Sequence, residues 1–245
     1  MVKIVSIHSF RGGTGKSNIT ANTAATLAAM GKRVGVIDTD ILSPGIHVLF
    51  GLNEDEIKHS LNDYIWGRCN ISDAAYKVKN GGDIWLIPSS IQLGEITRIL
   101  REGYDSALLN RGFEKLIDEL ALDILLIDTH PGVNEETLLS IAFSDTLIII
   151  LRPDQQDYQG TGVTVQVARK LVVPDLLLIA NKVPDNYGAV DFAAKLSETY
   201  QSEVAGVLYH SDEMMKLGSG GLFVLDYPNN PLTDEFKRIA TRILA

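Results

Sequence analysis

The sequence is poor in cysteine and in positive charge, and it has no long apolar run. Its 245 residues contain one cysteine, Cys69, and 22 Lys or Arg against 31 Asp or Glu, a formal net charge of −9. One cysteine cannot close an internal disulfide or form a CxxC metal or iron–sulfur motif. No stretch approaches the ~18 apolar residues of a membrane span. The acidic balance argues against a broad nucleic-acid-binding surface.

What remains is the composition of a soluble globular protein, with 45% hydrophobic and 22% charged residues. The length suits one large α/β domain or two small ones, and we find no linker, repeat or low-complexity tract. A single domain over residues 1–245 is therefore the simplest interpretation. The first apolar segment begins at residue 2 and leaves no room for a signal peptide, so we expect a cytoplasmic protein.

Short apolar runs alternate with helical patterns along most of the chain. Strands are predicted at 2–9, 33–38, 83–88, 123–128, 146–151 and 176–181. Helices are predicted at 17–31, 92–101, 107–121, 135–143, 157–171 and 188–200. This alternation predicts an α/β fold, a doubly wound and mostly parallel sheet with helices on both faces. The alternation is least regular at 45–80.

A glycine-rich segment, "SFRGGTGKSN", lies between the first strand and the first helix. Gly12, Gly13 and Gly15 allow a tight turn whose N–H groups converge on phosphate oxygens. Lys16 adds a cation, and Ser17 can offer its hydroxyl to Mg²⁺ at the start of the helix. An ordinary strand-to-helix turn is the alternative, but the order of strand, GGxGKS and helix favours nucleotide binding.

Acidic residues follow two other predicted strands. "VIDTD" places Asp38 and Asp40 at one strand end, and "LLLIDTHPG" places Asp128 at another. An Asp after an apolar strand is typical of the group that holds a nucleotide-bound Mg²⁺, and Asp40 can instead orient the attacking water. Helix capping is the alternative for each of them alone.

These motifs, together with "RPD", "NKV" and the C-terminal "NNPLTDEFKRIATRIL", resemble the MinD/ParA family of deviant Walker A P-loop ATPases, and most of all its MinD branch. The resemblance extends over nearly the whole chain. It implies a doubly wound fold that binds MgATP and forms an ATP-dependent homodimer with two nucleotides sandwiched between the subunits. It also implies slow hydrolysis stimulated by an unidentified protein activator or cargo adaptor, in the service of intracellular positioning.

The resemblance also implies roles for individual residues. The phosphate cradle would consist of Gly12, Gly13, Thr14, Gly15, Lys16, Ser17 and Asn18. Lys16 would contact the outer phosphates, and Ser17, Asp128 and Asp40 would form the magnesium site. Asp40 would also position the hydrolytic water, while Asp38 would support the loop. Asn181 would read adenine, and Asp154 would lie near the nucleotide and the dimer face.

Three positions depart from the common patterns. Phe10 stands where many phosphate loops have their first glycine, although this position varies in the family. Arg11 stands at the family's signature lysine, which crosses the dimer to the partner's phosphates. Arginine keeps the charge and adds a planar donor fork, but Arg11 could instead pair with a local carboxylate such as Asp40 or Asp154, or point into solvent. His130 stands where the family usually has proline. It could serve as a proton shuttle or a phosphate sensor, or it could be a structural histidine held by hydrogen bonds.

The same residues bear on other branches of the superfamily. Iron–sulfur carriers need interface cysteines that Cys69 alone cannot supply, and the tail lacks the tyrosine cluster of the related kinases. A ParA-like DNA-binding partition ATPase and an ATP-dependent biosynthetic synthase remain alternatives. We expect no membrane attachment, because the apolar face of the terminal helix is assigned to packing on the domain. That face consists of Phe236, Ile239, Ala240, Ile243 and Leu244.

Overall fold

The computed structural model describes residues 2–105 and 107–245, which contain one sheet of eight strands. The strands are β1 Lys3–His8, β2 Val34–Asp38, β3 Tyr76–Lys77, β4 Ile84–Ile87, β5 Ile124–Asp128, β6 Thr146–Leu151, β7 Asp175–Val183 and β8 Glu203–Tyr209. Their order across the sheet is β3-β4-β2-β5-β1-β6-β7-β8. All neighbours pair in parallel except β3, which runs antiparallel to β4.

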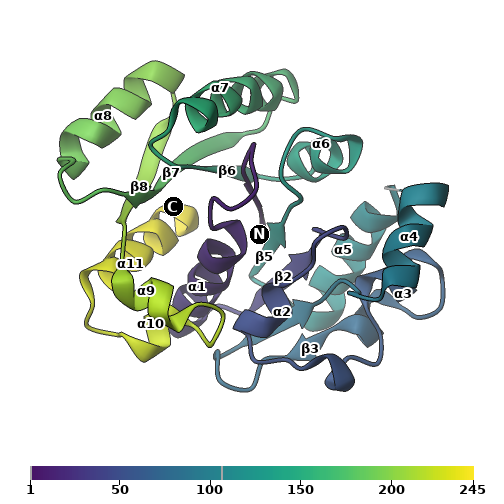
Figure 1. Cartoon of the computed structure of the whole chain (residues 1–245). Coiled ribbons are helices and arrows are strands. Elements are labelled where there is room, and N and C mark those ends of the chain that lie inside the picture. Colours follow the sequence, from purple (N-terminus) through teal and green to yellow (C-terminus); the bar gives the residue numbers. More distant parts are fainter. Residues whose placement is uncertain (1, 106) are drawn as a thin grey trace.

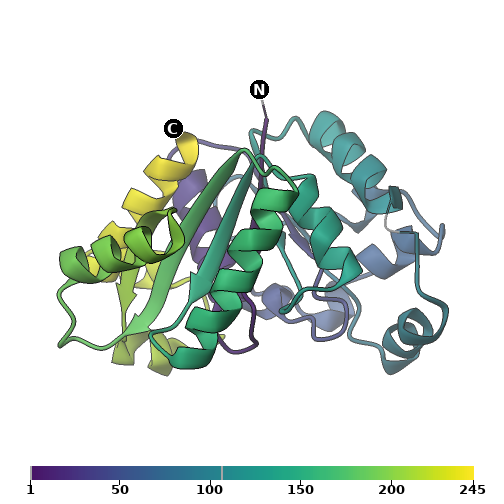
Figure 2. The same cartoon turned by 90° about the horizontal axis from the view of Figure 1, so that it is seen from above.

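Helices connect the strands and cover both faces of the sheet (Figures 1 and 2). The longer ones are α1 Lys16–Ala29, α4 Leu93–Glu102, α5 Ala107–Leu120, α6 Glu135–Ala142, α7 Gln155–Lys170, α8 Ala189–Tyr200 and α11 Pro231–Leu244. The short ones are α2 Ile46–Leu49, α3 Leu61–Ile65, α9 Asp212–Leu217, α10 Phe223–Asp226 and the 3₁₀ turns η1 Glu54–Glu56 and η2 Ile71–Ala74. The predicted doubly wound α/β fold is confirmed.

The two faces of the sheet bury separate cores because side chains alternate along each strand. In β6, Ile148 and Ile150 join the core that also contains residues of α1 and α11. Leu147 and Ile149 point the other way, into a core shared with α7 and α8. In Figure 1, α7 and α8 accordingly lie on one side of β6, β7 and β8, and α11 lies on the other. A further core joins β5 to α3 and α5.

The six predicted strands and six predicted helices are all present, with ends that differ by at most two residues. The prediction missed β8, whose sequence EVAGVLY is interrupted by Gly206. A Cβ at Gly206 would lie 2.7 Å from the side chain of Ile239, so the glycine lets α11 pack closely on this strand. The irregular region 45–80 contains only short helices, 3₁₀ turns and β3.

The terminal helix α11 packs on the domain rather than presenting an apolar face to solvent. Phe236, Ile239, Ala240 and Ile243 are fully buried, and Leu244 packs against the same core. The packing interpretation of this helix is therefore confirmed. Among the described residues, no helix has the length and apolar character required to cross a bilayer.

Candidate functional site

The candidate site lies at the point where the order of strands along the chain reverses. β1 lies between β5 and β6, and the chain moves outward from this centre in both directions. Loops at the carboxyl ends of parallel strands share one edge of the sheet, which is where such folds bind ligands. The loops after β1, β2, β5 and β6 therefore bring together the residues that the sequence singled out, although these are up to about 140 positions apart.

The glycine loop after β1 requires two left-handed residues. Gly13 and Gly15 have φ of 75° and 97°, a region that favours glycine. Gly15 also lies against Asn181, since a Cβ there would approach the amide nitrogen of Asn181 to 2.5 Å. The Gly15 carbonyl accepts the hydrogen bond of Ile19 N at 2.9 Å and so begins α1. The loop thus ends at a helix N-terminus, which favours anions.

Two side chains from β7 fasten this loop from outside. Asn181 Nδ2 donates to the Thr14 carbonyl at 2.7 Å, and Lys182 Nζ donates to the Gly13 carbonyl at 3.0 Å. Lys182 itself has a positive φ of 55°, at a register shift between β7 and β8. Asn181 was predicted to read adenine. Here its amide supports the phosphate loop, and the adenine role stays a prediction.

Lys16 is 93% buried, which is unusual for a lysine, and its charge acts on the Asp128 carboxylate. Asp38 and Asp128 are paired residues on the neighbouring strands β2 and β5. Burial raises the pKa of Asp38 well above its usual value, and the nearby charges of Asp128 and Asp40 raise it further. Burial also raises the pKa of Asp128, against the lowering effects of the Lys16 charge and of hydrogen bonds from Ser17 and Thr20.

This environment suits a hydrated divalent cation next to phosphate. The Oδ2 atom of Asp128 is buried and has no hydrogen-bond partner in the described structure, while Oδ1 accepts from the Thr20 hydroxyl at 3.1 Å. A cation beside this oxygen would offset the carboxylate crowding, and oxygen ligands are those that Mg²⁺ prefers. Within residues 2–105 and 107–245, no cluster of three or more His, Cys, Asp or Glu side chains has metal-binding geometry. A cation at Asp128 Oδ2 would need further oxygen ligands, which phosphate groups can supply.

Asp38 organises the loop after β2. Its Oδ1 accepts from Asp40 N at 3.0 Å, and its Oδ2 accepts from Gly45 N at 3.3 Å. The Asp40 side chain turns instead toward the loop after β5, where its Oδ1 lies 2.6 Å from His130 Nδ1. The sequence singled out both Asp40 and His130 but did not pair them.

Arg11 lies among carboxylates at the start of α7. Its guanidinium is 3.7 Å from Asp154 and 3.8 Å from Asp157. Asp154 caps α7 by accepting from the backbone N–H groups of Gln156 and Asp157. Of the two local partners expected for Arg11, Asp40 and Asp154, it is Asp154 that lies near in the free subunit, together with Asp157.

Asp157 is the site residue that the sequence analysis missed. It is buried, and its two oxygens accept from Arg152 Nε at 2.9 Å and from an Arg152 terminal nitrogen at 3.1 Å. Burial tends to raise the pKa of Asp157, but the hydrogen bonds from Arg152 outweigh it and leave the pKa below the usual value. An acidic residue three positions after the cap Asp154 is a helix-start pattern that could have drawn attention to it.

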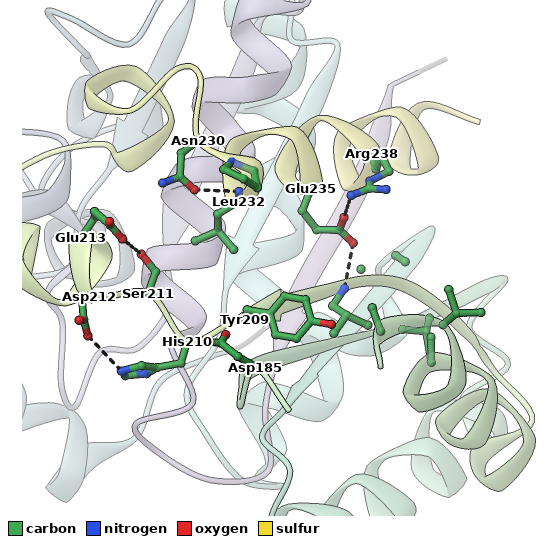
Figure 3. A pocket seen from close by; sticks show the side chains of 18 residues that line it. Asp185, Tyr209, His210, Ser211, Asp212, Glu213, Asn230, Leu232, Glu235 and Arg238 are labelled. Atoms are coloured by element: carbon green, nitrogen blue, oxygen red, sulfur yellow. Dashed lines mark hydrogen bonds and ion pairs between the residues drawn. The ribbon is translucent and has the colours of Figure 1, made fainter. Parts of the chain in front are cut away.

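The described chain also contains a groove of about 610 Å³ beside the edge strand β8 (Figure 3). It lies between α8, α9 and α11, and none of its lining residues belongs to the phosphate loop. Its polar groups are largely engaged with one another. Glu235 accepts from Val207 N at 3.0 Å and pairs with Arg238, while Ser211 donates to Glu213 at 2.9 Å. The loops around Lys16 therefore remain the candidate site.

Comparison with known proteins agrees with this geometry. A family model described as an AAA domain matches residues 2–173. The septum site-determining protein MinD of Bacillus subtilis is 26% identical over 100% of this chain and 90% of its own length. The chain belongs to the MinD/ParA family of P-loop ATPases. The MinD/ParA fold is also seen in the crystal structure of the cell division ATPase MinD of Pyrococcus furiosus, with a TM-score of 0.85, 20% identity and full coverage of both chains.

Other relatives in this MinD/ParA group carry different names. An ATP-binding protein of Methanocaldococcus jannaschii, MJ0547, is 29% identical over 100% of this chain and 88% of its own length. An iron–sulfur cluster carrier protein of Pyrococcus abyssi is 24% identical over 98% and 85%, respectively. Family membership therefore establishes an ATP-binding P-loop protein, while the individual task has to be argued from the residues.

Proposed function

We propose that this protein binds MgATP, forms an ATP-dependent homodimer and hydrolyses ATP slowly until a protein activator or cargo adaptor stimulates it. Its task would be the positioning or regulation of that partner in the cytoplasm. The observation that carries the proposal is the buried Lys16, which lies at a helix N-terminus with its charge near Asp128. The Asp128 carboxylate is in turn near that of Asp38, which is also near Asp40. A buried cation with convergent N–H groups suits triphosphate, and the carboxylates suit Mg²⁺ and water.

The residues divide into binding and hydrolysis roles. The loop N–H groups and Lys16 would bind the phosphates in the ground state. Ser17, Asp128 and Asp40 would hold the magnesium ion, which neutralises phosphate charge when bound. Asp40 would orient the attacking water, a task that matters in the transition state more than in ground-state binding. Arg11 would reach the phosphates of the partner subunit.

An iron–sulfur carrier role is the weaker alternative despite the named relatives. Burial, followed by the charges of Asp63 and Asp73, raises the pKa of Cys69 to about 11. A thiol with this pKa is protonated near neutral pH, whereas a cluster requires thiolate ligands. Cys69 is also the sole cysteine of the chain, so each subunit could offer at most one ligand.

The test compares two variants in nucleotide binding, turnover and mass in solution. Lys16→Ala should abolish stable ATP binding. Asp40→Ala should bind ATP within about threefold of the unchanged protein, lose hydrolysis by at least about 100-fold and accumulate as an ATP-bound dimer. Tight ATP binding by Lys16→Ala would overturn the phosphate-loop assignment.

The mass measurement also separates this proposal from a synthase of the same fold. ATP alone should drive dimerisation of a positioning ATPase. A synthase should stay inactive until a second substrate is added, because it uses ATP to activate that substrate. Equal loss of ATP binding and turnover in Asp40→Ala would show that Asp40 is a binding residue and not a water-positioning one.

A further inference from the structure

The Asp40 side chain is held by two donors on the same oxygen. Oδ1 lies 2.6 Å from His130 Nδ1 and accepts from Ser43 N at 3.2 Å. The Asp40 side chain is 11% exposed and that of His130 is 24% exposed, so the pair is largely shielded from water. A carboxylate without a proton only accepts, so the contact is a hydrogen bond when Nδ1 carries the hydrogen. The two oxygens share one planar carbon atom. A donor that holds Oδ1 therefore also restrains the direction in which Oδ2 points.

The backbone beneath Asp40 is fixed separately. Thr39 N and the Thr39 hydroxyl both donate to the Asp128 carbonyl, at 2.9 Å and 3.0 Å. Asp40 N donates to Asp38 Oδ1 at 3.0 Å. None of these bonds restrains the side-chain torsions of Asp40. Two contacts in the described structure therefore restrain the Asp40 carboxylate, the short one from the His130 side chain at 2.6 Å and the longer one from Ser43 N at 3.2 Å.

Hydrogen bonds of the neighbouring residues hold the backbone at His130 in place. The preceding Thr129 donates from N and from its hydroxyl to the Ile7 carbonyl of β1, at 3.2 Å and 3.0 Å. Two residues after His130, Gly132 N donates to the Ser9 carbonyl at 3.1 Å. These bonds tie the loop after β5 to the strand and turn that carry the phosphate loop. His130 lies 90 positions after Asp40 in the sequence. Its contact with Asp40 thus links the loop after β2 to the phosphate loop.

We infer that His130 is a positioning residue for ATP hydrolysis. It donates from Nδ1 to Asp40 and so directs the free oxygen of that carboxylate toward the attacking water. The inference rests on the proposed ATPase function, and it adds a residue that the resemblance to the family did not supply. A small angular error at a general base or water-orienting group costs rate without costing ground-state affinity.

The test uses substitutions that differ only in the donor. The amide nitrogen of Asn can replace Nδ1, because it stands at the same distance from the backbone, whereas Ala removes the donor. His130→Ala should lower kcat about 10- to 100-fold and leave ATP affinity within about twofold, since the lost contact is a charge-assisted hydrogen bond. His130→Asn should recover kcat to within about fivefold of the unchanged protein. His59→Ala is the control, because the hydrogen bonds at His59 involve its backbone N and O alone.

A double-mutant cycle separates positioning from general damage. With Asp40 already replaced by Ala, the change His130→Ala should cost less than about twofold in the residual rate, because its effect passes through Asp40. A merely structural role would instead lower the rate in both backgrounds and weaken ATP binding. Equal losses in the two backgrounds, failure of His130→Asn to recover the rate, or a higher kcat in His130→Ala would each overturn the inference.

A measurement without nucleotide distinguishes this inference from the proposed function. In nitrogen-labelled protein, the His130 imidazole should show a hydrogen on Nδ1 in a short hydrogen bond, and Asp40→Ala should abolish that signal. If the signal is present but the unchanged protein neither binds nor hydrolyses ATP, the proposed function fails while the contact stands. If ATP is hydrolysed but the signal is absent or insensitive to Asp40→Ala, the positioning role fails by itself.

Discussion

At the scale of single residues, Arg11 and Arg152 compete unequally for the same carboxylate. Arg152 engages Asp157 with two short hydrogen bonds, whereas Arg11 stands 3.7–3.8 Å from Asp154 and Asp157 with 41% of its side chain exposed. The Arg11–Asp154 pair is exposed on both sides, and such pairs contribute about 0–1 kcal/mol. Asp157 is buried, but its oxygens are already engaged by Arg152. Arg11 is therefore weakly tethered in the free subunit, and little free energy opposes its transfer to a phosphate group.

The first residue-scale prediction concerns Arg11 as the counterpart of the family's lysine. Arg11→Ala should bind ATP as a monomer, with dimerisation and stimulated hydrolysis lost, and Arg11→Lys should restore part of both. Guanidinium suits bidentate phosphate contacts, so the lysine variant should recover less than the full effect. Mass in solution and ATP turnover check both variants.

Mixing two inactive variants tests whether Arg11 acts in trans. Each dimer formed from one Arg11→Ala subunit and one Asp40→Ala subunit contains one site with an intact Asp40 and a partner-supplied Arg11. Turnover should reappear in the mixture, up to about half of the normal rate per mixed dimer. Normal dimerisation and hydrolysis by Arg11→Ala alone would contradict the cross-dimer role and leave Arg11 with its local carboxylates.

At the scale of elements, the phosphate loop is seated on helix α7 through Phe10. A Cβ at Gly160 of α7 would lie 2.1 Å from the Phe10 ring, so this glycine leaves the space that the ring occupies. A glycine inside a helix costs roughly 1 kcal/mol relative to alanine, which the contact must offset. The contact explains why a bulky residue is accommodated where many phosphate loops have glycine.

The contact between Phe10 and Gly160 predicts different effects on stability for two nearby glycine substitutions. Gly160→Ala should lower the free energy of unfolding by about 1–3 kcal/mol and weaken ATP binding, because the methyl group displaces Phe10 and the loop. Gly162→Ala is the matched control. Its Cβ would meet Tyr200 at 3.9 Å, an ordinary contact, and should be neutral or stabilise by up to about 1 kcal/mol.

Denaturant unfolding and ATP titration measure both effects. The double variant Phe10→Ala with Gly160→Ala should regain part of the lost stability, since the overlap is removed. Equal unfolding free energies and ATP affinities of Gly160→Ala and Gly162→Ala would contradict the proposed role of the Phe10–Gly160 contact.

At the scale of the whole molecule, the net charge and the packing of α11 bear on binding to membranes and nucleic acids. The formal net charge is −9, and the apolar side of α11 is used for packing against α1 and β8. One apolar face cannot both fill the core and enter a bilayer. Charged membranes and DNA are both polyanions, so an acidic protein is repelled at long range.

We therefore predict no strong retention on DNA and no binding to anionic liposomes at roughly 0.15 M salt, with or without ATP. Electrophoretic retention and liposome sedimentation measure this directly, with the Lys16→Ala variant as the nucleotide-free control. ATP-dependent DNA retention with a steep salt dependence would instead support the ParA-like partition alternative.

The sequence by itself determined the fold class and the phosphate-binding loop. Continuous apolar runs mark buried parallel strands, and the order of strand, GGxGKS and helix is a local pattern that needs no tertiary information. The same holds for the strand-end residues Asp38 and Asp128. Two strands were not predicted. β3 has only two residues, and Gly206 interrupts β8, whose burial depends on α11.

The tertiary structure decided which side chains meet. The His130–Asp40 bond joins positions 90 residues apart, and Asn181 and Lys182 reach the loop across more than 160 residues. The partner of Arg11 and the seat of Phe10 on Gly160 likewise depend on where α7 lies. A linear pattern specifies what each strand end carries. The twist and order of the strands set the distances between those ends, and hydrogen bonds depend on distances of a few tenths of an ångström.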